Sequence, residues 1–102
     1  MLELRPICEN CAKALPPESK EARICSHECT FCMTCVDGVL ENVCPNCGGG
    51  FERRPVRPVQ NWRDDNDLRH YPATTVRKHR PIDENAHGQF AASIKAIPAD
   101  KR

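Results

Sequence analysis

The fold is decided by the run Cys25-Ser-His-Glu-Cys29-Thr-Phe-Cys32-Met-Thr-Cys35, which lies between Cys8-Glu-Asn-Cys11 and Cys44-Pro-Asn-Cys47. These four close pairs contain all eight cysteines of the 102-residue chain. Only 5% of the residues are aromatic, so the chain can bury little apolar surface, and modules this small usually need disulfides or metal ions. The length also excludes enzymes of Rossmann, TIM-barrel or hydrolase size.

The start of the chain favours metal binding over disulfides. Residues 1–8 contain no apolar run typical of a secretory signal peptide, and no window approaches the apolar length of a membrane span. We therefore expect a cytoplasmic, reducing location and no membrane association. In such a location, closely spaced cysteines more often bind metal or do redox work than form a four-disulfide scaffold.

Each cysteine pair has the spacing of half a zinc site. A C-x2-C pair holds two sulfurs on one tight turn, about one tetrahedral edge apart. Four such half-sites make two complete all-cysteine sites, which leave no open position for water and are therefore structural rather than catalytic. Gly48 follows the last pair and permits a left-handed backbone that points N–H groups at the sulfurs. We expect two Zn²⁺ ions and no enzymatic activity.

A short hairpin and one helix are expected between the pairs. Residues 23–25 and 30–31 are typical of two very short strands around a turn. Four apolar residues after Cys35 lie on one helical face: Val36, Val39, Leu40 and Val43. A knuckle, a hairpin and a helix that carries ligands at its start are the parts of a treble-clef zinc fold. The predicted class is thus a small, metal-stabilised α+β module over residues 1–52.

The second half of the chain, residues 53–102, has a different composition. The Pro/Arg segment 53–59 favours an extended strap, and the polar remainder is expected to be partly disordered. The spacing of three apolar residues predicts one amphipathic helix over residues 88–97: Phe90, Ile94 and Ile97. The scattered histidines of this tail have no ligand spacing, and we expect them to be solvated: His70, His79 and His87.

The two halves also differ in charge. Residues 1–50 contain 4 basic and 7 acidic side chains, whereas residues 51–102 contain 11 basic and 7 acidic ones. An acidic head on a basic tail is not typical of a nucleic-acid-binding finger, so we expect no nucleic-acid partner. The basic stretch 70–80 is interpreted as a solvated linker, or as a segment that binds an acidic surface such as this protein's own head.

The cysteine pattern resembles a RING-type cross-brace over about residues 5–52. Cys29-Thr-Phe-Cys32-x2-Cys35 is similar to the His-x-Phe-Cys-x2-Cys of that family, with Cys29 in the histidine's place. The resemblance implies that alternate pairs share a metal ion, with sequential pairing as the alternative. Site 1 would contain Cys8, Cys11, Cys32 and Cys35, and site 2 would contain Cys25, Cys29, Cys44 and Cys47. His27 could replace Cys29, but the eight cysteines suffice and we expect an exposed turn histidine.

The stretch from Leu2-Glu-Leu-Arg-Pro to Cys44-Pro-Asn-Cys-Gly-Gly also resembles a family of short bacterial proteins of unknown function, which implies no activity. A RING of a ubiquitin ligase needs an apolar groove beside the first knuckle, where this chain has Glu9 and Asn10. We therefore expect a structural zinc-binding module that binds an unidentified protein partner. The alternatives are a ligase-like or enzyme-accessory RING module and, with less support, a nucleic-acid-binding, reactive-thiol or iron–sulfur protein.

Overall fold

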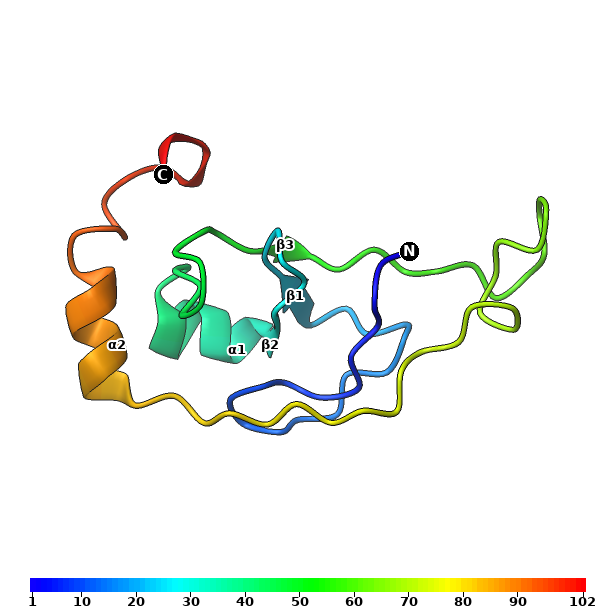
Figure 1. Cartoon of the computed structure of the whole chain (residues 1–102), viewed down its shortest axis with the longest axis horizontal. Coiled ribbons are helices and arrows are strands. Elements are labelled where there is room, and N and C mark those ends of the chain that lie inside the picture. The colour runs from blue at the N-terminus through cyan, green and yellow to red at the C-terminus, as the bar shows by residue number, and fades with distance from the viewer.

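A three-stranded antiparallel sheet lies at the centre of the molecule, in a computed structural model that describes all 102 residues (Figure 1). In chain order the elements are β1 (Ala22–Ile24), β2 (Thr30–Cys32), α1 (Met33–Cys35), η1 (Val36–Leu40), β3 (Glu52–Arg53), α2 (Glu84–Ala91) and η2 (Ala99–Lys101). The molecule is elongated, 45 × 27 × 18 Å, with α2 at one end and the loop of residues 58–71 at the other. The predicted α+β class is confirmed. No helix has both the length and the apolar character needed to cross a membrane.

The predicted hairpin is confirmed, and a third strand joins it. β1 is the central strand, and its Arg23 is opposite Phe31 of β2 on one side and Arg53 of β3 on the other. β3 has only two residues and follows the glycine-rich stretch 48–50. The boundary expected after residue 52 falls inside β3, so the sheet extends into the segment predicted to be a strap.

The predicted helix is also present. α1 and η1 form one helical stretch from Met33 to Leu40, which begins two residues before Cys35. The second half is a π-turn, and it ends because Glu41 and Asn42 have left-handed φ values of 53° and 57°. Three of the four residues on the predicted apolar face are buried: Val36, Leu40 and Val43. The helix therefore packs with Val36 and Leu40 of the face that the sequence indicated, but it ends at Leu40, so Val43 is buried beyond its end.

Sulfur replaces much of the ordinary apolar core. Six of the 12 residues in the main buried cluster are cysteines. The aromatic part of the core is a single edge-to-face pair, Phe31 and Phe51, with ring centroids 5.5 Å apart. Such a cluster offers little apolar area to oppose the entropy of chain ordering, so bonds through the sulfurs must supply much of the stability.

One arginine is part of the core. Arg54 directly follows β3 and its side chain is only 1% exposed. Its guanidinium donates to the carbonyl oxygens of Arg5 (2.8 Å), Leu15 (3.0 Å) and Pro16 (2.9 Å). Burial lowers the pKa of Arg54, and the nearby charge of Arg57 acts in the same direction. The side chain thus joins the end of the sheet to the N-terminal segment.

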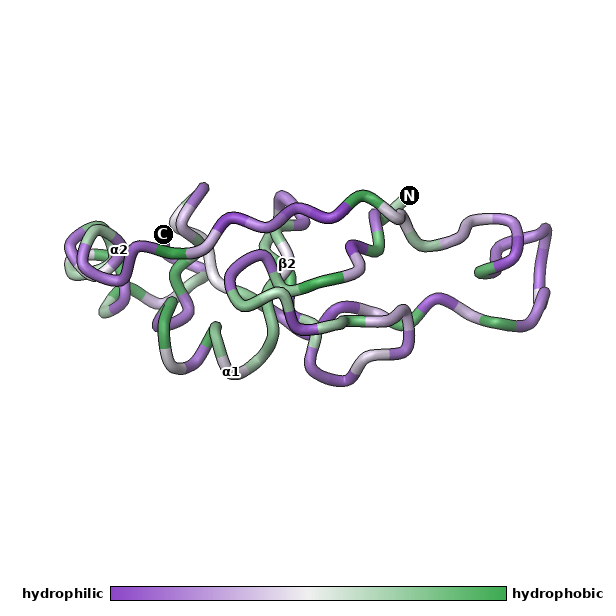
Figure 2. The backbone as a smooth tube through the Cα atoms, turned by 90° about the horizontal axis from the view of Figure 1, so that it is seen from below, coloured by the Kyte–Doolittle hydropathy of each residue, from purple (hydrophilic) through white to green (hydrophobic).

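The tail runs back along the cysteine module. The backbone N–H groups of Arg80 and Ile82 donate to Glu9 O (2.7 Å) and Asn10 Oδ1 (2.8 Å), and His79 Nε2 lies 3.0 Å from Asn10 O. Figure 2 shows this returning segment as mainly hydrophilic. The basic stretch therefore contacts the protein's own head, through backbone groups and His79. Attraction between its charges and the acidic head stays a prediction. Partial disorder of the tail stays a prediction.

The helix of the tail lies earlier than its apolar spacing predicted. α2 spans Glu84–Ala91 rather than residues 88–97, because the Asp83 side chain accepts from the N–H groups of Asn85 and Ala86 and so caps the N-terminus. The face toward η1 is formed by His87 and Ala91, both of which are buried. The expectation of a solvated His87 was wrong, since its Nε2 lies 2.9 Å from Leu40 O.

Two glycines make a matched test of this backbone. An added Cβ at exposed Gly38 of η1 meets nothing within 4 Å, so Gly38→Ala is expected to raise the free energy of unfolding by about 0.5–1 kcal/mol. Gly48 has a left-handed φ of 76°, so Gly48→Ala is expected to lower the free energy of unfolding by about 1–2 kcal/mol. Thermal unfolding of the metal-loaded variants measures both changes. If both substitutions changed the stability equally and in the same direction, the backbone conformations assigned to the two glycines would be contradicted.

Candidate metal centres

Site 1 is formed by four thiols from two distant segments. The Sγ atoms of Cys8, Cys11, Cys32 and Cys35 all lie within 4.8 Å of one another. The Sγ atoms of Cys11 and Cys32 are 3.8 Å apart, which is about the edge of a tetrahedron whose metal–sulfur bonds are ~2.3 Å long. The first and third pairs therefore meet, as the RING resemblance implies, and not the first and second.

Local structure positions each of these thiols. Cys8 and Cys11 lie on the first knuckle (residues 8–12), a turn closed by the Ala12 N–H, which donates to Cys8 O at 2.9 Å. Cys32 ends β2 and Cys35 ends α1, so the passage from strand to helix presents both sulfurs on one side of the knuckle. The hairpin and the start of the helix are thus the scaffold of site 1.

Site 2 is more open. The Sγ atoms of Cys25, Cys29 and Cys44 lie within 4.8 Å of one another, and all three residues are buried. Cys47 is exposed and belongs to an overlapping group with Cys25 and His27. The second and fourth pairs therefore meet as well. His27 is exposed, as expected, and its ligand atom is grouped with Cys25 and Cys47, whereas Cys29 belongs to the buried group.

Five N–H groups point at sulfurs of the two sites. Backbone N–H groups donate from His27 to Cys25 (3.3 Å), from Asn46 to Cys44 (3.4 Å) and from Gly49 to Cys47 (3.4 Å). Side-chain amides donate from Asn10 to Cys35 (3.2 Å) and from Asn46 to Cys29 (3.3 Å). Such bonds stabilise thiolates and fix the orientation of metal ligands.

Both knuckles contain an asparagine whose side-chain amide donates to a sulfur, a feature that the sequence analysis missed. Asn10 and Asn46 each occupy the position directly before the second cysteine of a C-x2-C pair, and each amide reaches a cysteine of the other pair in its site. The residue after that cysteine is left-handed in both cases, with φ of 63° at Ala12 and 76° at Gly48. The signal was visible in the repeated Asn-Cys dipeptide.

The thiols carry an electrostatic cost that a cation would remove. Burial raises the pKa of four of them above the ordinary thiol value: Cys8, Cys25, Cys35 and Cys44. Burial acts the same way on Cys11, but the Lys13 N–H and the neighbouring cysteines outweigh it and lower the pKa. A bound divalent cation favours the thiolate form and displaces the protons. The donor sets therefore fit metal ions, and none of the eight cysteines is in a disulfide.

Asn10 links site 1 to the tail, which makes it a test position. Asn10→Asp keeps the size but replaces the amide donor with a negative charge beside the Cys35 sulfur, while the acceptor for the Ile82 N–H is kept. Loss of such an outer-shell partner typically lowers metal affinity by about 10–100-fold. Competition with a chromophoric chelator measures the change, and unchanged affinity would show that the amide does not support the site.

Fold and sites together define a small cysteine-rich protein with two clusters of thiols whose geometry suits metal ions. The chain belongs to the family described as "Protein of unknown function (DUF1272)", whose model matches residues 1–57. It is 51% identical over 81 residues to the uncharacterized protein R02474 of Rhizobium meliloti (strain 1021), which covers 79% of this chain and 89% of that protein. No solved structure matches the chain significantly. The predicted family resemblance is confirmed.

Proposed function

We propose that this protein is a non-enzymatic zinc-binding protein, in which two closed sites hold a surface for binding another protein. The observation that carries the proposal is site 1, where the Sγ atoms of four cysteines from separate segments lie within 4.8 Å of one another and would together fill a tetrahedral coordination sphere. Zn²⁺ suits four thiolates in a closed tetrahedral site and has no redox chemistry of its own. The metal therefore acts as a cross-link of the fold.

Metal analysis of the full chain tests the zinc assignment. Purified protein is expected to be colourless and to contain two zinc ions per chain by elemental analysis. An iron–sulfur protein would instead be coloured and contain iron and inorganic sulfide. An all-cysteine donor set suits both kinds of site, so the metal and sulfide content is the measurement that decides between them.

The contacts of the tail support an interaction protein over a ligase-like module. A ligase-like reading needs an open apolar groove between the first knuckle and the helix. In this chain the tail segment 79–82 forms hydrogen bonds to Glu9 and Asn10 of that knuckle. The helical stretch after Cys35 is also covered in part, because α2 packs against η1. We therefore assign the partner not to an open groove of the ligase type but to the cavity that the tail and α2 form with the cysteine module.

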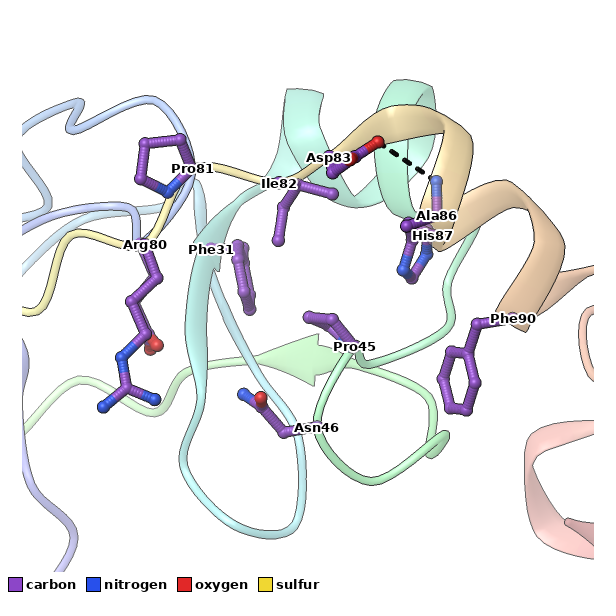
Figure 3. A pocket seen from close by; sticks show the side chains of 11 residues that line it. Phe31, Pro45, Asn46, Arg80, Pro81, Ile82, Asp83, Ala86, His87 and Phe90 are labelled. Atoms are coloured by element: carbon purple, nitrogen blue, oxygen red, sulfur yellow. Dashed lines mark hydrogen bonds between the residues drawn. The ribbon is translucent and has the colours of Figure 1, made fainter.

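A cavity of about 290 Å³ between the second knuckle (residues 44–48) and α2 is the surface we assign to the partner (Figure 3). Its apolar lining includes Phe31, Pro45 and Phe90. The ring of His87 also lines it and is buried, with its Nε2 held 2.9 Å from Leu40 O. An open cavity with this apolar wall fits an apolar side chain of a peptide.

The partner surface is tested by affinity purification of the full chain from its native host. Phe90→Asp is expected to remove a specific partner, because it places a charge on the exposed apolar edge of the cavity. Trp62→Asp is the matched control, since Trp62 is an exposed aromatic residue that does not line the cavity. Both variants should keep the metal content of the wild type. Equal retention of the partner by both would place the surface outside the cavity.

A further inference from the structure

Site 2 has more donors than a tetrahedral ion can use. Cys25, Cys29 and Cys44 form a buried group, and both Cys47 and His27 offer a ligand atom within 4.8 Å of Cys25. The two overlapping groups share Cys25 and together contain five donors, one more than a tetrahedral ion can use; neither His27 nor Cys47 lies within 4.8 Å of all three buried sulfurs. Four thiolates with one divalent ion would give the site a net charge of −2, which is the usual closed arrangement.

The three buried thiols are held more firmly than the fourth. Asn46 contacts two of them, through its backbone N–H to Cys44 and its side-chain amide to Cys29, and the His27 N–H is directed at Cys25. Cys47 receives one N–H, from Gly49, and is exposed. It is also not within 4.8 Å of all three buried sulfurs, because it is absent from their group. The weakest position of site 2 is therefore the one beside His27.

Site 1 has no histidine near its exposed thiol and serves as a comparison for site 2. Cys11 is exposed like Cys47, but its group contains only the four cysteines, and no histidine ligand atom belongs to it. The Sγ atom of Cys11 is already at tetrahedral spacing from Cys32. Site 1 therefore has four donors for four positions, and its exposed thiol has no substitute.

We infer that His27 is an exchangeable ligand of site 2, able to take the place of Cys47 on the metal ion. The inference rests on the proposed zinc sites. In the exchange, the bond from the metal to Cys47 Sγ breaks and a bond to a nitrogen of neutral His27 forms, while the released thiolate takes a proton from solvent. The ligand set changes from four sulfurs to three sulfurs and one nitrogen, and the net charge of the site rises from −2 to −1. Cys47 is then a surface thiol in a protein that still holds both ions.

Metal content and spectra of full-chain variants test the exchange. Cys47→Ser is expected to keep two metal equivalents, and its Co²⁺ form should show the weaker thiolate charge-transfer absorption of three sulfurs instead of four. Adding His27→Ala to Cys47→Ser should reduce the content to at most one equivalent. Cys11→Ser, the matched control in site 1, should also fall to at most one. His27→Ala alone should keep two, since Cys47 then fills the position.

Several results would overturn the inference. It fails if Cys47→Ser loses metal as Cys11→Ser does, or if the double variant binds Co²⁺ as tightly and with the same spectrum as Cys47→Ser. Two zinc ions in the wild type combined with either result would leave the proposed zinc sites intact, whereas fewer than two in the wild type would contradict those sites.

A second measurement uses the unchanged chain and so does not depend on the folding of a variant. Limited reaction of the zinc-loaded protein with iodoacetamide should modify Cys47 first, as mapped by mass spectrometry. The singly modified protein should retain two zinc ions in native mass spectra. Loss of an ion with the first modification would contradict the exchange.

Discussion

Exhaustive chelation is expected to unfold the cysteine module. Structural zinc sites contribute an apparent ~10–16 kcal/mol each in small zinc peptides at pH 7, and this chain has a core in which half of the clustered residues are cysteines. Without metal, eight thiols lose their cross-links and only a small apolar cluster is left. Far-UV circular dichroism and the dispersion of amide NMR signals should therefore both collapse when a strong chelator is added.

The control for this experiment is the return of zinc under reducing conditions. Both signals should recover, because the expected loss is one of metal and not of covalent structure. Native circular dichroism and full NMR dispersion in metal-free protein would contradict the proposed role of the two sites. Mg²⁺ in place of Zn²⁺ should give no recovery, since thiolates are poor ligands for that ion.

Arg54→Ala is expected to cause the largest loss of stability among substitutions that leave the cysteines intact. It removes three charge-assisted hydrogen bonds and leaves the carbonyl groups of Arg5, Leu15 and Pro16 without this donor inside the protein. Buried polar groups without partners cost about 1–3 kcal/mol each, so we expect the free energy of unfolding to fall by about 3–5 kcal/mol. Chemical denaturation at saturating zinc measures the difference.

Arg53→Ala is the matched control for this substitution. Arg53 is the neighbouring residue, carries the same side chain and is exposed on β3, so its truncation should change stability by no more than about 0.5 kcal/mol. Arg54→Lys should give an intermediate loss, because one ammonium group cannot reach three carbonyl groups with the geometry of a planar guanidinium. Similar losses for Arg53→Ala and Arg54→Ala would refute the structural role of Arg54.

Local sequence was enough to predict the centre of the molecule. The spacing of the cysteine pairs indicated two clusters, and the apolar residues at positions 36, 39, 40 and 43 indicated the helix between them. These features depend on periodicities and turn geometries of a few residues, which a sequence displays directly. The RING resemblance then indicated which pairs would meet, a question that spacing alone left open.

The contacts of the tail could not be predicted because they join residues far apart in the chain. Nothing in the sequence near Arg54 indicates that its hydrogen-bond partners are the carbonyl oxygens of Leu15 and Pro16. Likewise, nothing near His87 indicates that its partner is the carbonyl oxygen of Leu40. The helix of the tail was misplaced for a local reason, since its apolar spacing was given more weight than the N-cap at Asp83. The asparagine before the second cysteine of each knuckle was overlooked as a partner of sulfur.

The hairpin β1–β2 is common to both metal centres, and this has a consequence for how the protein takes up metal. Its turn carries Cys25 and Cys29 of site 2, and its second strand ends at Cys32 of site 1. The ion that binds first must therefore order a hairpin that the other ion also needs, and the second ion meets ligands whose chain entropy has already been lost. Loading should be cooperative. In a zinc titration, native mass spectra should contain mainly empty and doubly loaded chains, with few singly loaded ones.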